Sequence, residues 1–322
     1  MGEIFVVAEH RMGEVREITF EMLFKAHELC QGLSHTLTAI VIGGKGEAFV
    51  NDIAQRADRV IAVEDEQLTD FDSDLAKEIL KRLLEKDRPF LTLMGHTSLG
   101  RDLAPALAIE TGFPLATDCV DILIENGYPH VMRQMYNGKL FSKVSFKKSE
   151  CYLITVREGV FPPDMVEGRK GEVVRQGIPA DLPGARKQFV EFVDEGAGEV
   201  DISKADLLVS VGRGISEEEN IGAVKTLADL MGGVLSCSRP VVDKKWLPKY
   251  HQVGTSGKSV KPKVYISFGI SGAFQHVAGL SGAGTVIAIN KDPKAPIFRV
   301  ADYGVVDDLF KIVGALKEKL GG

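Results

Sequence analysis

The sequence predicts a two-domain α/β protein. Residues 1–196 are expected to form an N-terminal α/β domain with an antiparallel meander, and residues 197–322 a C-terminal domain with a doubly wound parallel sheet. The chain of 322 residues is too long for one ordinary core. Strand-like runs alternate with helical patterns in both halves, and a polar, glycine-rich stretch from Asp194 to Glu199 separates the halves. We therefore place the boundary at about residue 197.

The first domain follows a βαβ pattern like that of nucleotide-binding domains. Strands are predicted at 4–8, 36–42, 59–63 and 90–94. Helices are predicted at 19–32 and 75–84, where apolar residues recur close to helical spacing. Ser98 is expected to cap a further helix from Arg101 to Thr111.

The pattern then changes to an antiparallel meander. Two Asn-Gly pairs, at 126–127 and 137–138, flank the predicted strand from Pro129 to Tyr136. Asn-Gly suits the left-handed dihedrals of type I′ hairpin turns. We expect the meander to start with a strand at 122–125 and to end with the strand 151–157.

The second domain returns to alternating strands and helices. Strands are predicted at 206–211, 234–236, 264–268 and 285–289. Ser216 and Glu219 have the spacing of a capping box at the start of a helix, whose predicted buried face consists of Ile221, Val224, Leu227 and Met231. A short helix carries Gln275 and His276, and a closing helix is expected at 305–320.

Composition and motifs exclude several function classes. Apolar residues at 44% and charged residues at 26% are typical of soluble globular proteins, and a net charge of −6 argues against a nucleic-acid partner. No apolar run is long enough for a transmembrane segment, and no signal peptide is visible. Four scattered cysteines predict neither disulfides nor zinc, but reduced thiols in a cytoplasm-like compartment.

The sequence contains no complete copy of several familiar catalytic and nucleotide-binding motifs. Gly257-Lys258-Ser259 resembles the end of a phosphate-binding P-loop, but Gln252 stands where its first glycine belongs and a strand follows. GxGxxG after a strand, GxSxG and HExxH are all missing. Hydrolase chemistry therefore has no visible nucleophile and base.

Polar residues follow several strands of the second domain at their carboxyl ends, where open α/β sheets bind ligands. They are Arg213, the pair Ser238-Arg239, and the segment from Ser271 to His276 at a helix start. The loop 254–257 adds backbone and hydroxyl donors. Together they predict a site for a pyrophosphate or an electron-rich ring.

Each of these residues also has a purely structural interpretation. Arg213 could pair with a glutamate of the run 217–219, and Arg239 with Asp243. His276 could be a packed or surface histidine, and Thr255 and Ser256 could be turn residues. Convergence at one sheet edge favours the binding site over these alternatives.

The second domain resembles the α subunit of electron transfer flavoprotein. Motifs of that family occur in order and at the family's spacing between about residues 205 and 313, and more loosely in the first domain. They are SRPVVD at 238–243, QVG at 252–254, GK at 257–258, GISGA at 269–273, QH at 275–276, AINKDP at 288–293 and ADYG at 301–304.

The resemblance implies a heterodimer with a β subunit, on which the N-terminal domain would pack, and one FAD held by the C-terminal domain. The β subunit would carry AMP or a second FAD. Arg239 would lie over the isoalloxazine, His276 would face its pyrimidine carbonyl, and Asn290 with Asp308 and Leu309 would hold the adenosine end. The full set of implied FAD-binding residues is Arg213, Ser238, Arg239, Gln252, Val253, Gly254, Thr255, Ser256, Ser271, Gly272, Ala273, Phe274, Gln275, His276, Asn290, Asp308 and Leu309.

One position departs from the family pattern. Thr255-Ser256 stands where the family commonly has Gln-Thr, so the hydroxyl expected near flavin N5 is a serine without the methyl that stiffens χ1. A guanidinium and an imidazole near the flavin would stabilise the negative charge of the reduced ring and so favour one-electron transfer.

The implied function is electron carriage rather than an enzyme's own substrate chemistry. Electrons would come from flavin dehydrogenases, such as the acyl-CoA dehydrogenases of fatty acid β-oxidation, and pass to a quinone-linked oxidoreductase or a ferredoxin. The compartment would be the cytoplasm, or the mitochondrial matrix for a processed eukaryotic form. Three alternatives stay open: an electron-bifurcating, NADH-oxidising flavoprotein, an NAD- or CoA-binding transferase module, and a structural subunit without flavin.

Overall fold

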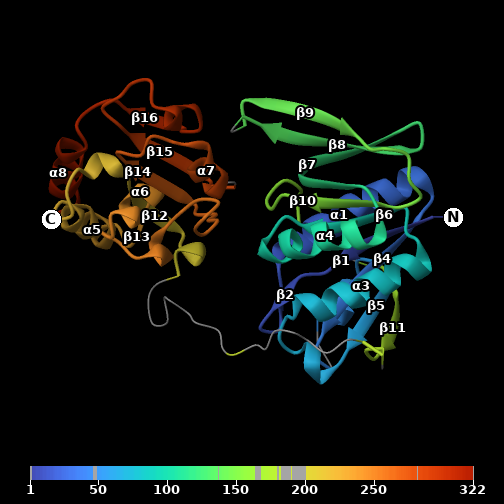
Figure 1. Cartoon of the computed structure of the whole chain (residues 1–322). Coiled ribbons are helices and arrows are strands. Elements are labelled where there is room, and N and C mark those ends of the chain that lie inside the picture. The colour runs from blue at the N-terminus through green and yellow to red at the C-terminus, as the bar shows by residue number, and fades with distance from the viewer. Residues whose placement is uncertain are drawn as a thin grey trace. The chain divides into compact units, whose positions relative to one another are not determined.

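The computed structural model describes residues 2–45, 49–136, 138–163, 168–179, 181–182, 190, 201–280 and 282–321. The chain divides into two compact units, Met1–Glu191 and Phe192–Gly322. The predicted linker at 194–199, with the boundary at 197, lies outside the described residues, as does Asn137. Each unit is an α/β structure built on its own sheet (Figure 1).

The N-terminal unit is built on a nine-stranded mixed sheet with the order β11-β5-β4-β1-β6-β10-β7-β8-β9. Its parallel part contains the predicted strands as β1 (Glu3–Val7), β4 (Thr36–Gly43), β5 (Arg59–Glu64) and β6 (Leu91–Gly95). Among the strands, the edge strand β11 (Glu172–Gln176), parallel to β5, and a small hairpin of β2 (His10–Arg11) and β3 (Glu14–Val15) were not predicted.

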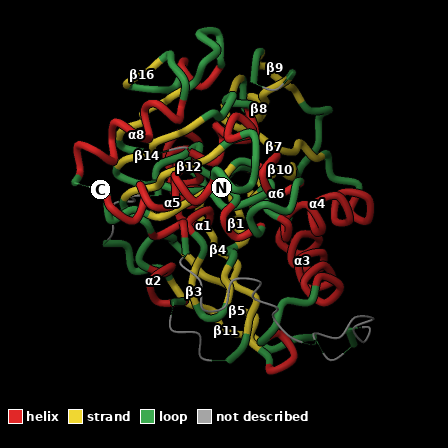
Figure 2. Tube along the Cα trace, turned by 90° about the vertical axis from the view of Figure 1, so that its left-hand side faces the viewer, coloured by secondary structure: helices red, strands yellow, loops and turns green. Residues whose placement is uncertain are grey.

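Helices cover both faces of this sheet, which confirms the doubly wound pattern. The core on one face includes residues of α1 (Glu17–Leu33) and of the short α2 (Val50–Ala54), which was not predicted. The core on the other face includes residues of α3 (Ser73–Asp87) and α4 (Ser98–Thr111). Figure 2 shows the strands of the sheet with helices beside them.

The predicted cap of α4 is wrong by one residue. Thr97, not Ser98, is the N-cap, and its hydroxyl oxygen accepts hydrogen bonds from the backbone N–H groups of Leu99 and Gly100. Thr97 also donates to the Glu9 carboxylate over 2.9 Å. This buried hydrogen bond comes from a distant part of the chain, and local spacing does not show it.

The meander is confirmed except for its last strand. β7 (Leu115–Glu125), β8 (Tyr128–Met135) and β9 (Leu140–Ser145) are antiparallel, and positive φ values of 52° at Asn126 and 79° at Gly127 agree with the type I′ turn. β10 (Tyr152–Val156) instead lies between β6 and β7 and is parallel to both. All its residues are buried, as is typical of an interior parallel strand.

The C-terminal unit has a five-stranded, wholly parallel sheet with the order β13-β12-β14-β15-β16. Its strands are β12 (Leu207–Val211), β13 (Val234–Cys237), β14 (Val264–Phe268), β15 (Thr285–Ile289) and β16 (Tyr303–Val305). α5 (Ile221–Leu230) and α8 (Leu309–Leu320) pack on one face. All strands run the same way, so their carboxyl ends share one edge.

Two boundaries in this unit differ from the prediction. No capping box forms at Ser216, because this residue ends the 3₁₀ turn Arg213–Ile215 with a φ of 68°, and Asn220 is the N-cap of α5. The closing helix starts at Leu309 rather than 305, because β16 takes up Tyr303–Val305 and the Asp308 carboxylate caps the helix at Phe310 N.

Candidate functional site

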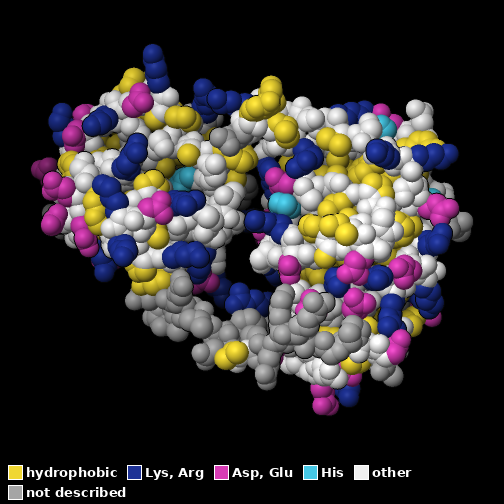
Figure 3. All heavy atoms as spheres, viewed as in Figure 1, with side chains coloured by type: hydrophobic (Ala, Val, Ile, Leu, Met, Phe, Trp, Pro, Cys, Tyr) yellow, Lys and Arg dark blue, Asp and Glu magenta, His cyan; other side chains and the backbone are white. Residues whose placement is uncertain are grey.

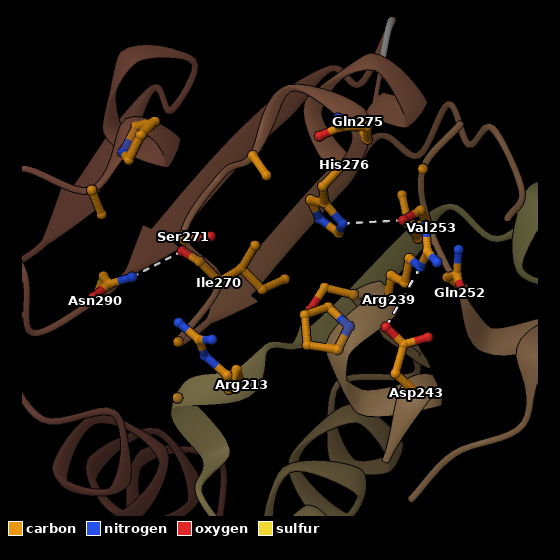
Figure 4. A pocket seen from close by; sticks show the side chains of 18 of the residues that line it. Arg213, Arg239, Asp243, Gln252, Val253, Ile270, Ser271, Gln275, His276 and Asn290 are labelled. Atoms are coloured by element: carbon orange, nitrogen blue, oxygen red, sulfur yellow. Dashed lines mark hydrogen bonds and ion pairs between the residues drawn. The ribbon is translucent and has the colours of Figure 1, made fainter. Parts of the chain in front are cut away.

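The carboxyl edge of the C-terminal sheet carries a pocket of about 720 Å³. The segments that follow β12, β13, β14 and β15 line it together with the loop 252–256. Figure 4 shows Arg213, Arg239, Ser271, His276 and Asn290 around this space. The predicted meeting of strand ends is therefore present.

Most residues of the predicted set line the pocket, and four do not. The lining residues are Arg213, Ser238, Arg239, Gln252, Val253, Gly254, Thr255, Ser256, Ser271, Ala273, Gln275, His276 and Asn290. Gly272, Phe274, Asp308 and Leu309 are absent from the lining. Asp308 instead caps α8, and Leu309 is buried in the core.

The two arginines supply positive charge at the pocket. Arg239 begins the short helix α6 (Arg239–Asp243), and its Nε lies 3.5 Å from Asp243 Oδ2. Both side chains are well exposed, at 67% and 60%, so water screens this pair and Arg239 can exchange it for an anionic ligand. Within the described chain, Arg213 has no ion pair with the glutamates 217–219.

The loop after Gln252 is held in shape by its own hydrogen bonds. The Gln252 amide donates to Ser256 Oγ over 2.8 Å, which leaves the serine O–H proton free to donate to a ligand. Gly254 has a φ of 137°, and a Cβ there would lie 2.8 Å from the Gln275 carbonyl oxygen. Only glycine allows this loop to approach the segment before His276 so closely.

The turn after β14 presents small residues to the pocket. Gly269 and Gly272 have φ values of 65° and 78°, and the helix that follows, α7 (Phe274–Val277), has only four residues. The predicted helix-dipole contribution comes from a short helix, so it is small, because one turn aligns few peptide units. Positive potential comes mainly from Arg213, Arg239 and Lys291.

His276 is held by two hydrogen bonds within the domain. It is 6% exposed, its Nδ1 lies 3.1 Å from the Val253 carbonyl oxygen and its Nε2 lies 2.8 Å from the Tyr265 hydroxyl. Burial lowers the pKa of His276 to about 4. At neutral pH its ring is uncharged, and neither nitrogen is free to face a ligand.

Several lining residues were not in the predicted set: Gly214, Ser216, Pro240, Asp243, Gly269, Ile270, Lys291, Asp292, Ala295 and Pro296. Lys291 and Asp292 directly follow Asn290 beyond β15, where the strand-end rule does place ligand contacts, although the set implied by the resemblance did not include them. Ala295 and Pro296 follow a turn in which Asn290 Oδ1 accepts from Asp292 N, and the strand pattern carries no signal for them.

These side chains fit an anionic, ring-bearing cofactor. Guanidinium groups suit phosphate oxygens, and a pocket of this size, mixed in polarity, is of the range that holds large organic ligands. The described residues contain no group of three or more His, Cys, Asp or Glu side chains arranged for a metal ion. Among the same residues, no helix combines the length and apolar character needed to cross a membrane.

Two family models match the chain. An electron transfer flavoprotein domain matches residues 4–181, and an electron transfer flavoprotein FAD-binding domain matches residues 201–281, which include much of the pocket.

Curated relatives extend over nearly the whole chain. The electron transfer flavoprotein subunit alpha of Thermoanaerobacterium thermosaccharolyticum is 36% identical over 321 residues, which cover 99% of this chain and 97% of that protein. That of Methylophilus methylotrophus is 36% identical over 323 residues and 99% of each chain. The acryloyl-CoA reductase electron transfer subunit beta of Anaerotignum propionicum is 33% identical, covering 97% of this chain and 93% of that protein.

Proposed function

The chain belongs to the electron transfer flavoprotein family as an α subunit, and from this premise we propose that the pocket at the carboxyl edge of its C-terminal sheet holds FAD. The electrons come from flavin dehydrogenases and go to a quinone-linked oxidoreductase or a ferredoxin. One observation carries the proposal: the cationic, hydroxyl-rich pocket lies largely within the part of the chain that matches the FAD-binding domain. FAD supplies the redox chemistry, so the protein needs no acid–base pair of its own.

Different residues of the pocket bind different parts of FAD, according to their chemistry. Arg213 and Lys291 offer cationic donors for the pyrophosphate, and Asn290 lines the part assigned to the adenosine. Arg239 stabilises negative charge on the ring, and Ser256 donates its free O–H. Leu309 acts indirectly, since its Cδ2 lies 3.0 Å from where a Cβ on Gly269, a residue of the pocket lining, would be.

The N-terminal unit offers a surface for the β subunit. Exposed apolar side chains gather on the β8–β9 hairpin (Figure 3): Met135 at 40%, Tyr136 at 75%, Leu140 at 58% and Phe141 at 60% exposure. β9 is also the edge strand of its sheet. We assign this hairpin to the contact with the β subunit, because such a concentration of apolar groups is unusual on a free surface.

The cysteines fit a reducing compartment. All four are buried and unpaired, and burial raises the pKa of the Cys237 thiol to about 12, so it remains protonated and unreactive. We therefore assign the protein to the cytoplasm.

Co-expression with the β subunit gene and a visible spectrum test the function. We expect yellow protein whose colour changes in steps during titration with a reductant. Colourless protein that binds NAD would instead support the transferase alternative. One flavin per heterodimer is expected for a simple carrier, whereas two flavins and NADH oxidation would indicate the bifurcating type.

A further inference from the structure

A buried polar cluster lies beneath the pocket, around Tyr265. The Tyr265 ring is fully buried at 0% exposure, and its hydroxyl bonds to His276 Nε2 over 2.8 Å. The hydroxyls of Ser210 and Ser236, on β12 and β13, lie beside the Tyr265 oxygen without the geometry of a full hydrogen bond. Both serines are 0% exposed and pair directly in the sheet register.

The protons in this cluster can be assigned from the acceptors. The Val253 carbonyl can only accept, so the proton of the neutral ring lies on His276 Nδ1. Nε2 then has a lone pair, and the Tyr265 O–H donates to it. The Val253 carbonyl thus fixes the tautomer of His276, and the Tyr265 hydroxyl holds the other side of the ring in place.

The same cluster can accommodate a charged His276. A proton on Nε2 would need an acceptor, and the Tyr265 oxygen can serve if its own proton rotates toward another acceptor. The hydroxyl oxygens of Ser210 and Ser236 have no hydrogen-bond partner with good geometry among the described residues, so they can receive it.

We propose that Tyr265 is a positioning residue that, with Ser210 and Ser236, lets His276 take up one proton when negative charge enters the pocket. The inference rests on the proposed function, because the reduced flavin is the source of that charge. The electron comes from the reductant and the proton from solvent water. The Tyr265 proton is redirected to a serine oxygen and not lost.

The electrostatic surroundings allow such a change. The charged and titratable groups around His276 are Tyr265, Cys237, the Arg239–Asp243 pair, and Lys258, whose Nζ lies 2.6 Å from Asp201. Arg213, Lys291 and Asp292 line the same pocket. None of their charges is among the causes of the low His276 pKa, which burial dominates. A pKa above 7 requires about a thousandfold higher proton affinity than a pKa of about 4, and negative charge that enters a buried site raises the pKa of a neighbouring imidazole.

Nitrogen NMR of the ¹⁵N-histidine-labelled, FAD-loaded heterodimer tests the proton directly. In the oxidised protein at pH 7 we expect His276 with a proton on Nδ1 only. After reduction with dithionite we expect protons on both nitrogens. A ring that stays neutral after reduction would overturn the proposal.

Variants test the relay by the pH dependence of the reduction potential. In the unmodified protein we expect the potential of the first one-electron reduction to fall as pH rises between 6 and 8, with a slope that approaches one proton per electron. Tyr265→Phe removes the acceptor that the described residues offer to Nε2–H, and should abolish the slope. The double change Ser210→Ala and Ser236→Ala should reduce it while the phenol remains in place.

Ser267→Ala is the matched control. Ser267 is also 0% exposed and pairs with Ser210 in the sheet register, but its hydroxyl donates to the Ile287 carbonyl. This control should keep the slope of the unmodified protein. An unchanged slope in the double serine variant would refute the relay even if Tyr265→Phe does not fold.

Failure of this inference can be told from failure of the proposed function. If the heterodimer contains no FAD, the proposed function fails. The His276 tautomer in the flavin-free protein then still tests whether the Tyr265 hydroxyl donates to Nε2. If FAD binds and the NMR and pH results contradict the expectation, only the role of Tyr265 is wrong.

Discussion

Among single residues, Arg239 carries a positive charge that can readily leave its present ion pair and bind an anion in the pocket. Its ion pair with Asp243 is long and solvent-exposed, so it contributes little to stability and competes weakly with a bound anion. Arg239→Ala should lower the reduction potential of bound FAD by the equivalent of roughly 1.5–3 kcal/mol, the usual contribution of a hydrogen bond to a charged group. A redox titration of the heterodimer measures the change.

Two variants serve as controls for Arg239. Arg239→Lys keeps the charge and should retain most of the potential. Lys244→Ala removes a neighbouring charge whose Nζ lies 4.0 Å from the Trp246 ring centroid and which is not part of the pocket lining; it should have little effect. Equal potentials in Arg239→Ala and the unmodified protein would refute the role assigned to the guanidinium.

Gly272 shapes the pocket without lining it. It has a φ of 78°, and a Cβ there would lie 2.3 Å from the backbone nitrogen of Ile297. Gly272→Ala should therefore destabilise the C-terminal unit. Left-handed backbone strain alone costs roughly 1–3 kcal/mol of unfolding free energy, and the steric clash adds to this cost. Urea unfolding followed by Trp246 fluorescence measures the effect.

Gly222 is the matched control for this glycine. It lies inside α5, and a Cβ there would meet nothing within 4 Å. Gly222→Ala should raise stability by roughly 0.5–1 kcal/mol, because alanine loses less backbone entropy in a helix. If both substitutions changed stability equally, the positive φ and the close contact at Gly272 would not contribute to the stability of the unit.

At the level of elements, the start of α4 shows how a buried contact decides a boundary. Thr97→Ala removes the cap and the hydrogen bond to buried Glu9, and should cost about 1–2 kcal/mol of unfolding free energy. Ser98→Ala, at the exposed first helical position, should change stability by less than about 0.5 kcal/mol. Chemical denaturation of the two variants compares them, and a larger loss for Ser98→Ala would contradict the observed cap.

Elements with a regular local signal were predicted well, and those defined by their neighbours were not. The runs at 4–7 and 264–268 are strands because most of their side chains are β-branched or aromatic and buried. The run at 152–156 looks the same locally, yet its position between β6 and β7 depends on long-range pairing. Similarly, β16 has only three residues and forms a strand through its contact with β15.

At the level of the whole molecule, assembly with the β subunit should depend on the β8–β9 hairpin. Phe141→Glu places a charge on the exposed apolar surface and should weaken the heterodimer at least roughly tenfold. Ile109→Glu is the control, because Ile109 is 84% exposed on α4, away from the hairpin sequence. Analytical ultracentrifugation gives both dissociation constants, and an unaffected Phe141→Glu heterodimer would rule out this contact.

FAD should stabilise the C-terminal unit selectively. The only tryptophan of the chain is Trp246, which packs against the core of that unit and reports its unfolding alone. Free FAD at about 100 times its dissociation constant should stabilise this unit by about 2.7 kcal/mol. We expect FAD to shift the fluorescence transition of the isolated chain more than a circular dichroism transition that reports both units; equal shifts would contradict separate unfolding.

The sequence by itself determined the order of most strands and helices and the polar residues that follow the strands, because both depend on local side-chain pattern and on the shared edge of parallel strands. It also identified the family, through motifs at fixed spacing. Only the tertiary structure decided that Asp308 caps α8 and Leu309 is buried in the core, that Thr97 caps α4, and that both nitrogens of His276 have partners inside the domain. Each of these depends on contacts that the local side-chain pattern does not show, and burial then sets the strength of those contacts.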